Sequence, residues 1–164
     1  MKAAVVYDSY YGNTKAVAEA IAQELGAEGH ESELRSVRER YPASPTGDIL
    51  FLGSPVRMGS VTSRVKRYVK RLGEGGWKGK QIIAFTTILA LPENPTDEQK
   101  NSRERYDLGA GRKLRDLARE QGLSAVEDHL WAEVVGMKGP LAEGAIEKTR
   151  QFVRDVLLAV DHEE

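Results

Sequence analysis

Two short segments rich in glycine and hydroxyl residues have the composition of ligand-binding loops. The first, Ser9-Tyr10-Tyr11-Gly12-Asn13-Thr14, joins an apolar run to a segment with helical spacing of its apolar residues. The first N–H groups of a helix lack intrahelical partners and carry the positive end of its dipole, so they favour an anion. Ser9 and Thr14 add hydroxyl donors, and Asn13 suits a tight turn. Gly12 has no side chain, so the backbone can approach a bound anion closely. These residues predict a phosphate site without lysine or arginine, the alternative being a plain strand-to-helix turn with Thr14 as N-cap.

The second segment, Gly53-Ser54-Pro55-Val56-Arg57-Met58-Gly59-Ser60, directly follows the apolar run Asp48-Ile-Leu-Phe-Leu. In a site for a flat ring, proline and glycine shape the backbone, and free N–H groups of the loop bond the polar edge of the ring. A third segment, Thr86-Thr87-Ile88-Leu89, ends another apolar run. We expect all three segments to meet at one site.

The two glycine-containing loops resemble those of the flavodoxin family. The phosphate loop of that family reads Thr/Ser-x-Thr-Gly-x-Thr, which Ser9, Gly12 and Thr14 match, whereas Tyr11 stands where the middle threonine is usual. Gly53-Ser54-Pro55 is similar to the segment that these proteins place against the isoalloxazine ring. The resemblance runs along nearly the whole chain. It implies one non-covalently held FMN, with its terminal phosphate on the first loop.

The resemblance also implies which residues surround the flavin. Flavodoxins usually bring a tryptophan or tyrosine to the loop that corresponds to 53–60, to the one that corresponds to 86–89, or to both, and this chain has neither residue in these two segments. Met58, Ile88 and Leu89 are the expected apolar substitutes, unless Tyr10, Tyr11 or Tyr106 reaches the ring from elsewhere. The full set of predicted FMN contacts is Ser9, Tyr10, Tyr11, Gly12, Asn13, Thr14, Ser54, Pro55, Val56, Arg57, Met58, Gly59, Thr86, Thr87, Ile88 and Leu89.

Alternating strands and helices must position these loops. Apolar runs predict strands at 2–7, 48–53, 81–86 and 130–135, and a more polar run at 31–37 predicts an edge strand. Apolar residues at helical spacing predict helices at 14–25, 61–72, 109–121 and 146–160. The alternation predicts one α/β domain over residues 1–164, a doubly wound five-stranded parallel sheet in the order 2-1-3-4-5. Residues 8–14 and 54–62 should then face each other where the strand order reverses.

Two further segments have a distinctive composition. Residues 89–102 are long and contain Pro92 and Pro95, so they predict an irregular, mobile cover at the ligand-binding end of the sheet. The predicted helix at 61–72 gathers five cations on its polar side, namely Arg64, Lys66, Arg67, Lys70 and Arg71. That side is either merely solvated or a docking patch.

Composition excludes several classes of function. The chain of 164 residues has no cysteine, which excludes disulfides, thiolate metal sites and cysteine nucleophiles, and favours a cytoplasmic location. Lys plus Arg (24) nearly balances Asp plus Glu (25), so no nucleic-acid partner is expected. No apolar run is long enough to cross a bilayer. His30, His129 and His162 have no metal-ligand spacing, and surface or edge positions are expected for them.

Three functions follow from these patterns. The leading hypothesis is an FMN electron-transfer protein whose partner is another redox protein. The second is a small FMN oxidoreductase of the quinone or porphyrinogen type, in which the segment after Thr86 closes over a small redox substrate. The third is a flavin-free interaction module with the same fold. A response-regulator receiver shares the strand order, but it requires an aspartate at the end of the third strand, where this chain has Gly53-Ser54.

Overall fold

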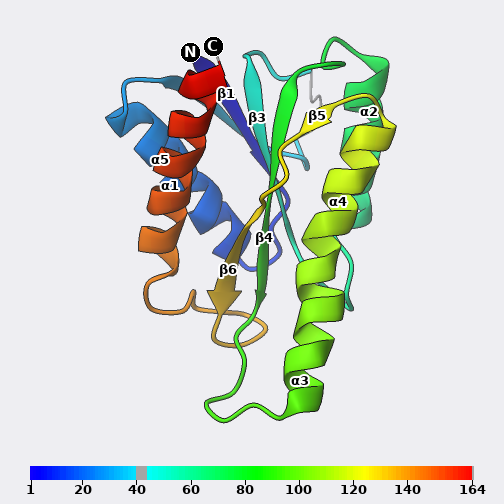
Figure 1. Ribbon diagram of the computed structural model, residues 1–164, viewed down its shortest axis with the longest axis vertical. Coiled ribbons are helices and arrows are strands. Elements are labelled where there is room, and N and C mark those ends of the chain that lie inside the picture. The colour runs from blue at the N-terminus through cyan, green and yellow to red at the C-terminus, as the bar shows by residue number, and fades with distance from the viewer. Residues whose placement is uncertain (40–43, 164) are drawn as a thin grey trace.

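The computed structural model describes residues 1–39 and 44–163, with side chains as far as residue 160. Its centre is a parallel sheet of β1 (Lys2–Tyr7), β2 (Glu31–Ser36), β3 (Ile49–Pro55), β4 (Gln81–Leu89), β5 (Ser124–Ala125) and β6 (Leu130–Val134) (Figure 1). The order is β2-β1-β3-β4, and both β5 and β6 pair with β4 on its other side. The predicted order 2-1-3-4-5 is confirmed, with the fifth strand divided into two pieces.

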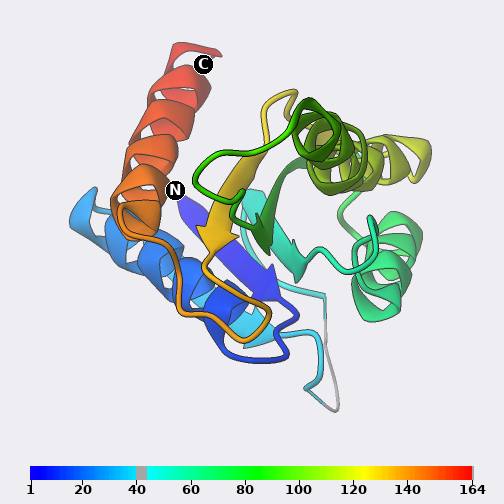
Figure 2. The ribbon, with the colours of Figure 1, turned by 90° about the horizontal axis from the view of Figure 1, so that it is seen from below.

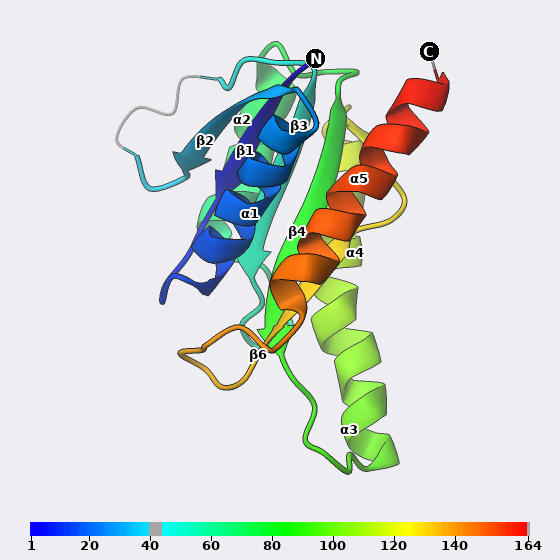
Figure 3. The same cartoon turned by 90° about the vertical axis from the view of Figure 1, so that its left-hand side faces the viewer.

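Helices cover both faces of this sheet. They are α1 (Asn13–Ala27), α2 (Ser63–Glu74), α3 (Asp97–Ser102), the π-helix η1 (Arg103–Asp107), α4 (Leu108–Glu120) and α5 (Ala145–Glu163). Figures 2 and 3 show α1 and α5 side by side on one face, and Figure 2 shows α2 and α4 on the other. Within the described residues, no helix has the length and apolar character needed to cross a membrane.

Each face of the sheet has its own apolar cluster. Ile49 and Phe51 pack with α1 and α5, whereas Leu50 and Leu52 pack with α2 and α4. Because β3 is covered on both sides, every one of its residues from Ile49 to Ser54 is buried, which explains its unbroken apolar run. Trp77 completes the second cluster, and its indole N–H donates to the Pro45 carbonyl at 2.8 Å.

The central strands extend further than their apolar runs predict. Thr86, Thr87, Ile88 and Leu89 belong to β4, where they pair with residues 131–134 of β6, so this strand continues three residues beyond the predicted range 81–86. The threonines do not interrupt the strand because β-branched side chains fit a pleated sheet. The longer strands carry their side chains directly to the ligand-binding edge.

The prediction of an irregular segment at 89–102 is wrong for its second half. α3, η1 and α4 follow one another without a break from Asp97 to Glu120. A capping box starts this helical stretch: Gln99 N–H donates to Thr96 Oγ1 at 3.1 Å, and Thr96 N–H donates to Gln99 Oε1 at 2.9 Å. The Thr-x-x-Gln pattern was therefore a readable start signal. Residues 90–96 alone form the non-helical connection.

Candidate functional site

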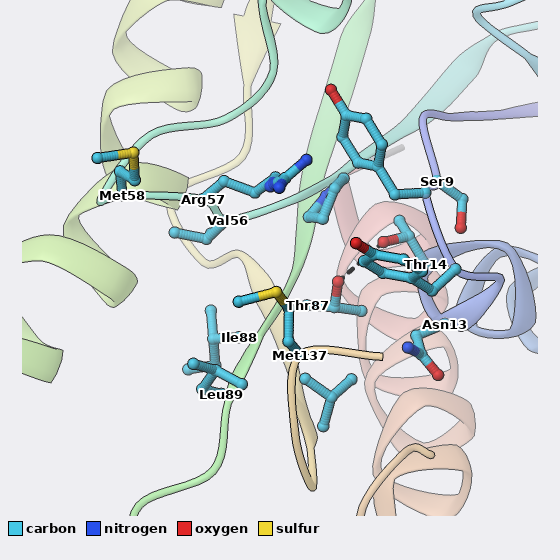
Figure 4. Close-up of a pocket in the computed structure, with 14 residues that line it drawn as sticks. Ser9, Asn13, Thr14, Val56, Arg57, Met58, Thr87, Ile88, Leu89 and Met137 are labelled. Atoms are coloured by element: carbon cyan, nitrogen blue, oxygen red, sulfur yellow. Dashed lines mark hydrogen bonds between the residues drawn. The ribbon is translucent and has the colours of Figure 1, made fainter. Parts of the chain in front are cut away.

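A pocket of about 390 Å³ opens at the carboxyl ends of the strands (Figure 4). It lies between the loop after β1 and the loop after β3, so these loops face each other as the topology predicts. The residues that line it are Ser9, Tyr10, Tyr11, Asn13, Thr14, Pro55, Val56, Arg57, Met58, Thr87, Ile88, Leu89, Val134 and Met137.

The loop after β1 forms an anion cradle from backbone groups. Gly12 is the N-cap of α1 and has φ 92°, a left-handed conformation that a side chain would strain. Its N–H donates to Ser9 Oγ at 3.0 Å, which fixes the turn. In the described part of the chain, the N–H groups of Asn13, Thr14 and Lys15 have no acceptor. These three donors, at the positive end of α1, are the groups that a phosphate would occupy.

Thr14 links this cradle to the floor of the pocket. It is 1% exposed, and its Oγ1 lies 2.8 Å from Oγ1 of Thr87 in β4, as the dashed line in Figure 4 marks. The alternative in which Thr14 caps the helix is wrong, since Gly12 occupies that position and Thr14 is already inside α1. The hydroxyl pair therefore ties the start of α1 to the end of β4.

A tight two-residue turn forms the opposite wall. Arg57 N–H donates to the Ser60 carbonyl at 2.9 Å, and Ser60 N–H donates back to the Arg57 carbonyl at 3.1 Å. Met58 (φ 52°) and Gly59 (φ 73°) form its left-handed corner. The Met58 side chain is fully exposed and points away from the other labelled residues in Figure 4. Held this way, Met58 lines the pocket at its exposed rim.

Two arginines stack on Tyr10 at the mouth of the pocket. The guanidinium carbons of Arg57 and Arg38 lie 4.4 and 4.6 Å from the centre of its ring. Arg38 Nε also donates to Oδ1 of the buried Asp8 at 2.7 Å, and Asp8 Oδ2 has no partner in the described residues. Cation–π attraction thus holds the Tyr10 ring between Arg38 and Arg57, and the ion pair with Asp8 fixes Arg38.

Four of the predicted contacts do not line the pocket, namely Gly12, Ser54, Gly59 and Thr86. Gly12 and Gly59 shape the backbone. The Ser54 hydroxyl is buried within the β3–α2 connection, where it accepts from Thr62 N–H at 3.0 Å and donates to the Pro55 carbonyl at 2.8 Å. Thr86 is buried as well and does not reach the pocket, whereas the three residues that follow it in β4 all line it.

The sequence reasoning missed three functional residues. Val134 and Met137 line the pocket on the β6 side, and Arg38 holds Tyr10 from the segment after β2. The predicted strand order places the end of the last strand at the same edge of the sheet, so that order was a usable signal for Val134. Tyr10 and Tyr11 supply the aromatic lining, whereas Tyr106 packs against Gly59, where an added Cβ would lie 3.1 Å from Tyr106 Cβ.

Among the residues that the structure describes, no group of three or more histidine, aspartate or glutamate side chains has the geometry of a metal site. The candidate site therefore consists of backbone N–H donors, hydroxyl groups, the two arginines at its mouth and an apolar floor.

Comparisons with known proteins agree on one family. A family model described as a flavodoxin domain matches residues 4–125. The flavodoxin of Aquifex aeolicus (strain VF5) is 33% identical over 112 residues, and this match covers 57% of this chain and 60% of that protein.

Solved structures of flavodoxins share the fold over nearly the full length. A flavodoxin from the domain Archaea superposes with a TM-score of 0.69 at 19% identity, covering 99% of this chain and 100% of that one. A variant of the Fusobacterium nucleatum flavodoxin, bound to flavin mononucleotide, superposes with a TM-score of 0.64 at 15% identity, covering 99% and 96%. At these identities the superpositions show a common fold.

Proposed function

Since the chain belongs to the flavodoxin family, we propose that it holds one FMN in the pocket and carries electrons to or from a redox partner protein. The observation that carries this proposal is the cradle at the start of α1. Its free N–H groups on Asn13, Thr14 and Lys15 lie beside an apolar pocket, which matches a ligand with an anionic end and a flat ring.

The residues present fit FMN in two respects. The phosphate would accept hydrogen bonds from the cradle, and the Ser9 hydroxyl, which accepts from Gly12, still has its own hydrogen to donate. The ring would lie against Val56, Ile88 and Val134, with Tyr10 and Tyr11 at its border. In the described residues, the N–H groups of Met58 and Gly59 have no acceptor and are the donors available to the polar edge of the ring.

The surroundings of the pocket support transfer to a protein partner. FMN supplies the redox chemistry, and the chain decides which molecules approach it. Large apolar side chains are exposed around the mouth: Tyr10, Tyr11, Met58, Leu89 and Met137 are each between 42% and 105% exposed. A rim of this kind favours direct contact with another protein surface. We place the carrier in the cytoplasm, in keeping with its cysteine-free sequence.

Reconstitution tests the proposal. The purified chain, stripped of any bound flavin, should take up one FMN per chain and develop a shifted flavin absorption spectrum. Reduced by a one-electron donor, this holoprotein should pass its electrons to a haem protein such as cytochrome c. A chain whose addition leaves the FMN spectrum unchanged would contradict the proposal.

A second candidate function has one observation in its favour. A cavity of about 300 Å³ lies between residues 89–92 and the helical stretch that includes Arg103 and Asp107, and it shares Leu89 with the pocket. A small substrate there would lie next to the flavin, as in an FMN oxidoreductase. Multiple-turnover reduction of a quinone by the holoprotein with NADH or NADPH would support this function. Reduction of protein acceptors alone would favour the carrier.

A further inference from the structure

A second concave site lies away from the pocket, between α2 and the residues that follow β2. It is a groove of about 310 Å³ lined by Val37, Arg38, Arg64, Arg67, Tyr68 and Arg71. Arg64, Arg67 and Arg71 have the spacing i, i+3 and i+7, which places them along one stripe of the helix. Among the described residues, no carboxylate lines this groove.

In the part of the chain that the structure describes, the three helical arginines have no partners. Within residues 1–39 and 44–163, the side chains of Arg64, Arg67 and Arg71 make no hydrogen bond or ion pair. On α4, by contrast, Arg115 and Arg119 both pair with Glu127. Like charges three and four residues apart repel each other on a helix, so the stripe lacks the compensation seen on α4. An anion in the groove would supply that compensation.

Tyr68 gives the groove an unused hydrogen-bond donor. Its side chain lines the groove although the residue is only 4% exposed, and its hydroxyl has no partner in the described residues. Burial raises the pKa of this phenol above its ordinary value, so the hydroxyl keeps its proton. A buried polar group without a partner is costly, so an acceptor that entered the groove would be stabilised by this hydroxyl.

We propose that this groove binds the phosphate groups of a small ligand, through Arg64, Arg67, Arg71 and the Tyr68 hydroxyl. A guanidinium presents a planar fork of donors that matches phosphate oxygens, and several of them in one groove suit adjacent phosphates. The site shares no lining residue with the FMN pocket and does not depend on flavin binding. The two sites meet at Arg38, which lines the groove and also stacks on Tyr10.

Inorganic pyrophosphate is a suitable probe, titrated into the full chain while backbone amide NMR shifts are followed. We expect saturable shifts in α2 and at Val37 and Arg38. Because the cradle at Gly12 to Lys15 also favours anions, the same spectra separate the two sites. Shifts confined to the cradle, or no saturable shifts, would overturn the proposal. So would binding of an acidic peptide to α2 without binding of pyrophosphate.

Neighbouring charges on α2 provide a matched pair of variants. Arg71→Gln should raise the Kd for pyrophosphate about tenfold or more, the loss expected for a hydrogen bond to a charged group. Lys70→Gln removes one positive charge from the preceding residue, which does not line the groove. This variant should change the Kd less than about twofold. Equal losses in both variants would mean non-specific attraction and would refute the site.

Tyr68→Phe tests the buried donor by removing the hydroxyl alone. We expect the Kd to rise several-fold while the thermal unfolding temperature without ligand stays the same or increases, since an unpartnered polar atom is lost. An unchanged Kd in a folded Tyr68→Phe protein would exclude the hydroxyl from the site.

Discussion

Thr14 combines a structural contact with the proposed binding role. Its hydroxyl is engaged with Thr87, whereas its backbone N–H is free at the start of α1. The sequence pattern identified the residue but not its partner, because the two threonines are 73 positions apart. A hydroxyl accepts and donates at once, so Thr14 can keep its contact with Thr87 and still serve a phosphate oxygen.

Thr14→Ala should weaken FMN binding by roughly ten- to a hundredfold, because a hydrogen bond to a charged oxygen contributes about 1.5–3 kcal/mol. Riboflavin, which has no phosphate, should bind the variant and the natural chain alike. Flavin fluorescence titrations with both ligands measure the difference, and Thr14→Ser, which keeps the hydroxyl, is the control. Equal weakening for FMN and riboflavin would refute the assigned role.

Arg57 places a permanent positive charge at the mouth of the pocket, stacked on Tyr10. The second electron taken up by bound FMN gives an anionic ring, which this charge stabilises. Arg57→Gln should therefore lower the second reduction potential, by roughly a few tens of millivolts at an exposed site. Spectroelectrochemical titration at low salt measures it. Arg150→Gln, whose arginine lies in α5 outside the pocket, should leave the potential unchanged, and an unchanged or raised value for Arg57→Gln would eliminate the role.

At the scale of elements, Gly53 lets two central strands pack together. A Cβ at this position in β3 would overlap the ring of Phe85 in β4. Gly53→Ala should destabilise the fold by about 1–3 kcal/mol, the usual cost of overpacking a core. Gly26→Ala in α1 is the control, because a Cβ there meets no atom within 4 Å, and it should stabilise by about 0.5–1 kcal/mol. Urea unfolding measures both, and a Gly53→Ala variant as stable as the natural chain would contradict this packing.

His129 lies in the short connection between β5 and β6, where it packs against Gly111 of α4. Surface or edge positions were expected for the histidines; His129 is half-buried beside the two outer strands, and its Nε2 is buried without a partner in the described residues. Of the other two histidines, His30 is half-buried, and the side chain of His162 lies outside the described residues. Burial, together with Arg112 and Arg115, lowers the pKa of His129 from its usual 6.5.

This lowered pKa makes stability depend on pH. Below about pH 6.5 the unfolded chain binds a proton that the folded chain resists, so the free energy of unfolding should fall as the pH drops from about 7 to 5. His129→Gln should reduce this dependence. Urea unfolding at a series of pH values is the measurement. The same slope in the natural chain and in His129→Gln would contradict the explanation.

The local signals predicted the elements well and their ends less well. Hydrophobic periodicity identified the strands and helices because packing against the sheet imposes it. It missed the last three residues of β4, which begin with the polar Thr87 and are yet paired with β6. It also missed α3, in which no residue is buried and so no periodicity exists. The capping box at Thr96 and Gln99 was the one signal available there.

At the scale of the whole molecule, the order of the strands largely determined where the site lies. The strand order reverses between β1 and β3, so the loops that follow these two strands face each other. The alternation of strands and helices along the sequence was enough to predict this arrangement. Contacts between distant segments were not predictable, such as Asp8 with Arg38, because no local pattern encodes them. Two apolar clusters packed on one sheet support the proposal that residues 1–164 form a single domain.

The most direct test of the account is a parallel titration of the flavin-free chain with FMN and with riboflavin, followed by flavin fluorescence. A pocket that joins a phosphate cradle to an apolar ring site should bind one FMN per chain, and riboflavin at least about tenfold more weakly, since the free donors at Asn13 and Thr14 then have no anion to bind. Failure to bind FMN, or equal affinity for the two flavins, would contradict the central claim.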